Sequence, residues 1–231
     1  IARAERERDT ARMVSEFQSS LIAEADPARH GGREFTMLEA LEFVLPRWEV
    51  RLARDPPALA AVLDAAGGVN IALGRAAAAE SHLPRALELR EQSEGGASLT
   101  VVSTLCSLAR CLAMAHRFGD AHGALDRAAS AVRADHGEES PQFATVLVAK
   151  GRLLEDQYRW VLAVPVFEQA LLILAQHPEF VEARVEAQIG LASACRWGHR
   201  RLSEARQLLR AALASASEWQ GSTGTWVQTA V

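Results

Sequence analysis

Two arginines, Arg110 and Arg152, stand 42 residues apart, and this spacing recurs along the chain. At equivalent positions of neighbouring structural units, two guanidinium groups can grip a carboxylate or an acidic peptide through charge-assisted hydrogen bonds. The alternative is that both are solvated side chains on exposed helix faces. Trp197 is a candidate hydrophobic anchor for the same ligand, or else it packs against a further structural unit.

Other reactive side chains do not form a catalytic or metal-binding pattern. The seven histidines show no HExxH motif, and the three cysteines, Cys106, Cys111 and Cys195, show no CxxC spacing. Glu155 and Asp156 are adjacent on a predicted helix and face different directions, so they are not a general acid–base pair. The sequence also lacks a glycine-rich phosphate loop and the HRD and DFG triplets of protein kinases. We therefore expect no catalytic residue, no metal and no cofactor in this chain.

The composition is typical of a helical protein of ordinary polarity. Alanine supplies 44 of the 231 residues, and alanine loses no side-chain entropy in a helix. The 25 cations are outnumbered by 29 anions, for a formal net charge of -4, which argues against a nucleic-acid-binding surface. The chain has no run of eighteen apolar residues, so we expect no membrane span.

Five columns of residues repeat every 42 positions in four copies. Two columns are small: Ala79, Ala121, Ala163 and Ala205, then Ala86, Ala128, Ala170 and Ala212. The others are mostly large: Leu83, Leu125, Phe167 and Leu209; Leu63, Leu105, Leu147 and Ile189; Ala76, Phe118, Trp160 and Leu202. Apolar residues within each copy recur at three- and four-residue spacing, which predicts two helices per copy. One such hairpin cannot bury its faces alone, so the copies must stack.

The predicted fold is all-α, an α-solenoid of stacked antiparallel helical hairpins with an N-terminal helical cap. We expect first helices at 60–73, 102–115, 144–157 and 186–199, and second helices at 75–91, 117–133, 159–175 and 201–217. Residues 1–57 form linker and capping helices (3–24 and 37–53), the latter started by a capping box of Thr36 and Glu39. The four repeats span 58–99, 100–141, 142–183 and 184–217. Residues 218–231 are a tail or the start of a fifth repeat.

In such a stack the first helices line a concave groove, which is the expected binding surface. The residues predicted on the groove side are Asp64, Ile71, Ser103, Arg110, Met114, Thr145, Arg152, Glu155 and Trp197.

The repeat resembles the tetratricopeptide repeat. The segment "GGVNIALGRAAAAESHLPRALEL" carries the Gly, Leu-Gly-Arg, Ala and Arg-Ala-Leu positions of that family in order. The 42-residue length is similar to the longer version found in kinesin light chains. The resemblance implies a non-catalytic module that binds a protein or peptide partner. Family repeats commonly carry an asparagine pair where this chain has Cys106-Ser107 and Val148-Ala149, so amide clamping of a peptide is not expected at those positions.

The N-terminal region resembles the segment that follows the catalytic domain in a group of bacterial serine/threonine protein kinases. The similarity is carried by "RAERERD", "VSEFQSSLIAEADP", "TMLEALEFVLPR" and "DPP" in this order. It implies a piece of a larger signalling protein, either cytoplasmic or the soluble part of a membrane-tethered kinase. Two alternatives stay open: a domain that senses a small molecule or peptide, and a self-association domain whose C-terminal face forms homodimers.

Overall fold

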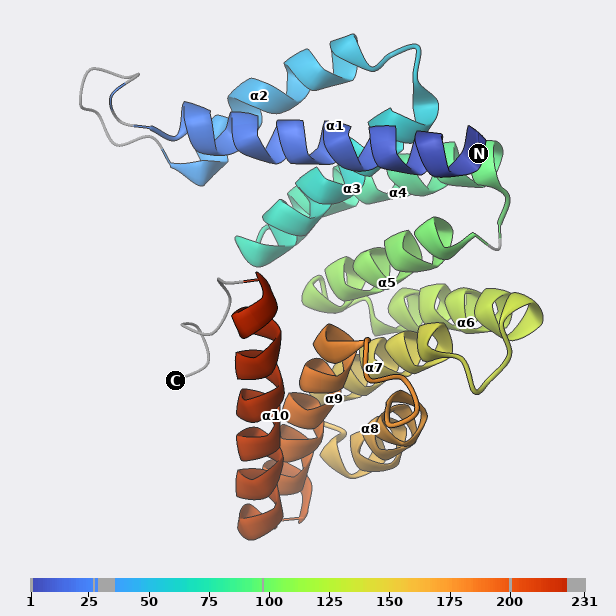
Figure 1. The fold of residues 1–231 in the computed structure, drawn as a ribbon, viewed down its shortest axis with the longest axis vertical. Coiled ribbons are helices and arrows are strands. Elements are labelled where there is room, and N and C mark those ends of the chain that lie inside the picture. Colours follow the sequence, from blue (N-terminus) through green and yellow to red (C-terminus); the bar gives the residue numbers. More distant parts are fainter. Residues whose placement is uncertain (1, 27, 29–35, 97, 200, 224–231) are drawn as a thin grey trace. The chain divides into compact units, whose positions relative to one another are not determined.

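The computed structural model describes residues 2–26, 28, 36–96, 98–199 and 201–223, and all regular structure within these residues is helical. Within each of two parts of the chain, consecutive helices pack against each other, which agrees with the predicted all-α solenoid class (Figure 1). The chain divides into two compact units, residues 1–115 and residues 116–231. Residues 224–231, part of the predicted tail or fifth repeat, lie outside the described residues.

The first unit contains α1 (Ala2–Glu24), α2 (Met37–Arg51), α3 (Pro56–Ala72), α4 (Ala76–Glu94) and α5 (Leu99–Met114). Helix α1 packs against α2 and α3, and the hairpin of α3 and α4 is extended by α5 (Figure 1). Phe17 of α1 and Trp48 of α2 meet edge to face, with ring centroids 5.9 Å apart in the core. The predicted capping box at the start of α2 is present, because Thr36 and Glu39 each accept a hydrogen bond from the other's backbone N–H.

The second unit contains α6 (Phe118–Asp135), α7 (Pro141–Asp156), α8 (Trp160–Leu174), α9 (Val181–Ala194), a π-helix η2 (Cys195–His199) and α10 (Leu202–Thr223). Helix α7 packs against α6, α8 and α9, and α10 packs along α9 (Figure 1). Helix α10 ends at Thr223, beyond the predicted end of this helix at residue 217.

First helices start earlier than the sequence analysis predicted. They begin at Pro56, Leu99, Pro141 and Val181 rather than at 60, 102, 144 and 186. Three of these starts have a side-chain N-cap that the apolar spacing does not register: the side chains of Asp55, Ser98 and Ser140 each accept a hydrogen bond from the backbone N–H three residues on.

The alternation of small and large columns produces close helix packing, as Phe167 shows. Its ring is fully buried between α7 and α9. A Cβ added at Gly151 of α7 would lie 2.5 Å from this ring, and one added at Gly190 of α9 would lie 2.3 Å from it. Leu83 meets Gly67 of its own hairpin in the same way. The small residues therefore let a large side chain fill the space between neighbouring helices.

The fourth copy of this large column departs from the prediction. Leu209 was expected to fill the space between hairpins, but its side chain is 50% exposed on α10. The equivalent Leu83, Leu125 and Phe167 are fully buried. Helices α4 and α8 continue through the exposed residues Pro84 and Pro165.

Candidate protein-interaction surface

The predicted groove residues are divided between the two units. Asp64, Ser103, Arg110 and Met114 lie in the first unit, and Arg152, Glu155 and Trp197 lie in the second. The proposed grip of one ligand by Arg110 and Arg152 together thus stays a prediction.

Asp64 lies in a polar cluster between α3, α4 and α5 rather than on an open groove wall. Its Oδ2 is 3.3 Å from Nη1 of Arg90, and both side chains are largely buried. The same Nη1 donates to the Thr100 carbonyl oxygen at 2.6 Å and to Thr104 Oγ1. Burial raises the pKa of Asp64, while Arg90 and Thr104 act in the opposite direction. The carboxylate therefore serves first as a contact between neighbouring helices.

Two other groove candidates of the first unit also pack in the apolar core. Ile71 is buried, and Met114 packs against the apolar cluster formed by Ile71, Leu83 and their neighbours. Ser103 and Arg110 are exposed on α5. Of the predicted groove residues in this unit, these two are the ones open to a partner.

In the second unit, Arg152 and Glu155 form a partly exposed charged pair on α7. Arg152 Nη1 lies 3.6 Å from Glu155 Oε2, and the two side chains are 44% and 8% exposed. Burial raises the pKa of Glu155, opposed by the charge of Arg152 and a hydrogen bond with Ser193 of α9. Glu155 Oε1 is buried and has no hydrogen-bond partner among the described residues, as is also the case for Asp64 Oδ1, Asn70 Oδ1 and Gln188 Oε1. An unpaired buried acceptor of this kind calls for a water, an ion or a ligand donor.

Trp197 lies on η2, one helical turn beyond Ser193. Its ring is 59% exposed, and the Arg196 guanidinium carbon lies 4.8 Å from the ring centroid. The π-helix is held tightly against the start of α8, since a Cβ at Gly198 would lie only 2.9 Å from Trp160 Cβ. Thr145, the remaining candidate, is exposed on α7 and donates to the Pro141 carbonyl oxygen.

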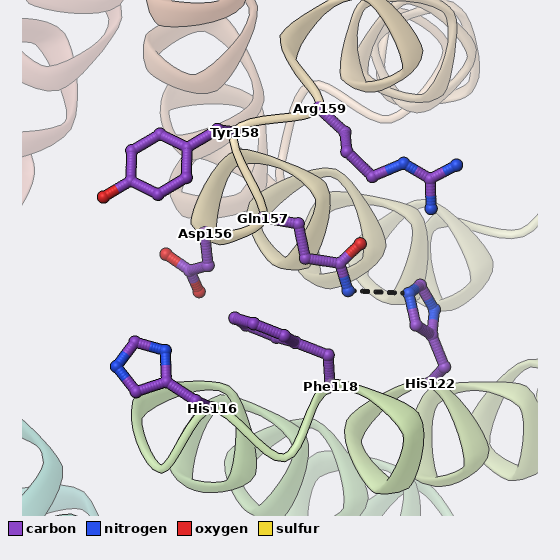
Figure 2. A pocket seen from close by; sticks show the side chains of 7 residues that line it. All are labelled: His116, Phe118, His122, Asp156, Gln157, Tyr158 and Arg159. Carbon is purple, nitrogen blue, oxygen red and sulfur yellow. Dashed lines mark hydrogen bonds between the residues drawn. The ribbon is translucent and has the colours of Figure 1, made fainter.

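A pocket that the sequence analysis did not predict lies at the hairpin turns of the second unit. It is a cavity of about 480 Å³. His116, Phe118 and His122 at the start of α6 form one wall, and residues 156–159, after the end of α7, form the other (Figure 2). A 3.0 Å hydrogen bond between Gln157 Nε2 and His122 Nε2 joins the two walls. The His116 and Phe118 rings meet edge to face at 5.7 Å.

Two residues of this pocket have a left-handed backbone. The φ angles are 58° at His116 and 59° at Tyr158, and the equivalent position of the first repeat is Gly74 with φ 73°. A left-handed conformation costs a non-glycine residue roughly 1–2 kcal/mol. The signal was present in the sequence as a 42-residue column, Gly74, His116 and Tyr158, in which the glycine of the Leu-Gly-Arg motif is replaced.

Cys111 and Cys195 are buried, and Cys106 is half-buried. Burial raises the pKa of Cys106 to about 12 and also raises the pKa of Cys195. Cys111 donates its thiol hydrogen to the Ala76 carbonyl oxygen at 3.2 Å. Within the described part of the chain, no group of three or more His, Cys, Asp or Glu side chains is arranged to hold a metal ion. No described helix combines the length and apolarity that crossing a membrane requires.

Comparisons with known proteins agree with this geometry. Residues 58–134 match the family model of the tetratricopeptide repeat, and repeats of this family generally mediate contacts between proteins. No curated protein matches the chain. Among solved structures, BtubC (BKLC) from P. vanneervenii is similar with a TM-score of 0.59 and 18% identity, over 96% of both chains. A putative kinesin light chain of Podosopora anserina with nearly identical TPR-like repeats is similar with a TM-score of 0.58 and 19% identity, over 90% of this chain and 98% of that one.

Proposed function

We propose that this chain is a non-catalytic interaction module that binds an acidic peptide or helix of a partner protein along its first helices. The observation that carries the proposal is the group of Arg152, Glu155 and Trp197 in the second unit. It combines a half-exposed cation, a buried carboxylate oxygen without a hydrogen-bond partner among the described residues and an exposed indole ring. A peptide carboxylate would pair with Arg152, and an apolar residue would pack on Trp197.

The test is binding of a defined library of acidic amphipathic peptides, measured by fluorescence anisotropy. We expect Arg152→Glu to weaken the best peptide at least tenfold, because the reversed charge repels its carboxylate. Arg110→Glu tests the contribution of the first unit in the same assay. Arg210→Glu, on exposed α10, is the control with the same change of charge. Equal binding by wild type and the Arg152→Glu variant would exclude this surface. If Arg152→Glu and the control Arg210→Glu lose the same peptide affinity, the attraction is an unspecific effect of charge.

A second proposal concerns the larger protein. The order of the N-terminal segments supports a place after the catalytic domain of a bacterial serine/threonine kinase, where the repeats would recruit a regulator or a substrate. The gene sequence ahead of Ile1 provides the test. A kinase domain encoded there would support the proposal, and a reading frame without one would contradict it.

Self-association is favoured by a separate observation. Leu202, Leu209 and Leu213 are all exposed on α10 and are spaced by seven and four residues, so they share one helix face. The residues equivalent to Leu209 in the three preceding repeats, Leu83, Leu125 and Phe167, are buried. If this face forms a homodimer, Leu209→Ser with Leu213→Ser converts a dimer to a monomer in analytical ultracentrifugation. A wild-type chain that sediments as a monomer at high concentration would exclude the dimer.

A further inference from the structure

The hairpin-turn pocket contains side chains that the stability of the fold does not explain. Tyr158 has a left-handed backbone and is 80% exposed, so its ring gains little from burial. His116 combines the same conformation with an exposed side chain. Glycine would fit both positions without strain, as Gly74 does at the equivalent place. Residues with a strained backbone cluster at binding and catalytic sites, because there the functional contribution of the side chain offsets the loss of stability.

The pocket also holds an arginine that differs from its equivalents in the other repeats. One arginine precedes each second helix: Arg75, Arg117, Arg159 and Arg201. Three of them pair with an acid: Arg75 with Glu42 at 3.2 Å, Arg117 with Asp120 at 2.6 Å and Arg201 with Glu204 at 3.5 Å.

Arg159 has no acidic side chain within ion-pair distance among the described residues. Leu162 stands where Arg117 and Arg201 have their acids, three residues on. The pocket wall therefore offers a guanidinium group that forms no ion pair with the described residues, and Asp156 also lines the pocket, nearer to His116.

The walls offer contacts for an aromatic ring as well as the Arg159 guanidinium group. In Figure 2, His116 and Phe118 lie on one side of the opening, and Tyr158 extends from the turn on the other side. The two ring pairs already present, His116 with Phe118 and Tyr158 with Trp160, meet edge to face at 5.7 and 6.0 Å. An additional aromatic ring can join such a cluster in the same geometry. A cavity of about 480 Å³ has room for a bulky side chain and the residue beside it.

We propose that this pocket binds a peptide segment of a partner protein in which an aromatic side chain is followed by an acidic residue. The ring lies among His116, Phe118 and Tyr158, and the carboxylate pairs with Arg159. This site uses none of the groove residues around Arg152, so binding at the pocket can be tested separately from binding at the groove.

The experiment titrates the full chain with N-acetyl-Trp-Glu-amide and follows backbone amide signals by NMR. We expect saturable shifts confined to residues 116–122 and 156–159. N-acetyl-Trp-Gln-amide lacks the charge and N-acetyl-Ala-Glu-amide lacks the ring, and each should bind at least tenfold more weakly. Arg159→Gln should remove the preference for the glutamate probe over the glutamine probe.

The strained position provides a second, structural readout. Tyr158→Gly should raise the thermal midpoint, because glycine adopts the left-handed conformation freely. The same substitution should weaken the Trp-Glu probe at least tenfold. Gly74→Tyr, which has open space for its Cβ, should lower the midpoint and leave binding unchanged.

Controls outside the pocket separate the two proposed sites. Arg152→Glu and Trp197→Ala should leave the probe's dissociation constant unchanged. Shifts that do not saturate, equal binding of the three probes, or full binding by the Tyr158→Gly variant would each overturn the pocket assignment. Loss of probe binding in the Arg152 or Trp197 variant would also overturn it, since the probe would then occupy the groove.

Discussion

Among single residues, the buried pair of Asp64 and Arg90 gives the sharpest prediction. Asp64→Ala would leave the Arg90 guanidinium buried without its anion, so we expect the free energy of unfolding to fall by roughly 3–5 kcal/mol. The later repeats carry uncharged residues at the equivalent positions: Cys106 with Val132, Val148 with Leu174, and Gly190 with Ala216. The double substitution Asp64→Val with Arg90→Val should therefore be near neutral or stabilising, because a packed apolar pair often replaces a buried ion pair at no loss.

Urea unfolding of the three variants measures this difference. If the double variant loses as much stability as Asp64→Ala, the polar cluster stabilises the contact of α3, α4 and α5 directly. The comparison also separates folding from binding, since Asp64 was a predicted groove residue that the structure places in the packing between helices.

Glu155 predicts a dependence of stability on pH. Burial raises its pKa above the ordinary value of 4.5, so the folded state holds the proton more tightly than the unfolded state. This contribution to stability is fully present below pH 4.5 and is lost as the pH rises through the raised pKa. Glu155→Gln stays neutral, so its stability relative to wild type should increase between about pH 4.5 and pH 7.

The measurement is urea unfolding of both proteins across this pH range. Glu168→Gln, on an exposed position of α8, is the control for the change of charge. A Glu155→Gln variant that loses stability relative to wild type as the pH rises would contradict the sign of this shift. It would indicate that Arg152 and Ser193 outweigh burial.

At the scale of helices, the contact of α7, α8 and α9 depends on two glycines beside Phe167. Gly190→Ala would place its Cβ 2.3 Å from the ring, far inside van der Waals contact distance. Since the ring is fully buried, we expect an overpacking loss of roughly 1–3 kcal/mol in the free energy of unfolding. Gly68→Ala, on α3 with no atom within 4 Å, is the matched control. It should gain up to about 1 kcal/mol from helix propensity.

Both glycine variants are compared by thermal and urea unfolding. Adding Phe167→Leu to Gly190→Ala should recover part of the loss, because the shorter side chain makes room for the methyl group. An unchanged or raised stability of Gly190→Ala alone would mean that α9 can move away from α8 at little cost.

Much of the helical architecture could be predicted from the sequence, because the large and small columns are the packing contacts themselves. The positions of Phe167 and of the two alanine columns that begin at Ala79 and Ala86 followed directly from the 42-residue spacing. Helix starts were predicted less well, since the N-caps Ser98 and Ser140 are polar and lie outside the apolar periodicity. The pocket could not be predicted from a binding motif, because its walls come from separate turns and its signal is a backbone angle at His116 and Tyr158.

The groove illustrates a different limit of the same reasoning. The repeat register placed Asp64, Ile71 and Met114 on the groove side with Arg110, but register alone does not distinguish an exposed flank from a contact between helices. That distinction depends on the individual side chains, such as the buried Arg90 that stands where the next repeat has Val132.

For the whole molecule, the chain of stacked hairpins predicts that damage stays local. Each repeat contacts its neighbours, so stability is a sum of repeat terms and nearest-neighbour interfaces. Gly190→Ala disturbs the contact of α8 and α9 in the second unit, whereas α1, α2 and α3 form a core of their own around Phe17, Trp48 and Leu63. We expect amide hydrogen exchange to accelerate in α7–α10 and to stay unchanged in α1–α3.

Exchange followed by mass spectrometry resolves these segments. Exchange should differ between the segments because local opening requires only the free energy of the contacts that it breaks. Asp64→Ala supplies the reciprocal case, since it should accelerate exchange in α3, α4 and α5 and leave α8–α10 as in wild type. If either variant accelerates every segment by the same factor, the chain opens as one cooperative body. In that case a ligand bound at the turn pocket of the second unit would also stabilise the first unit.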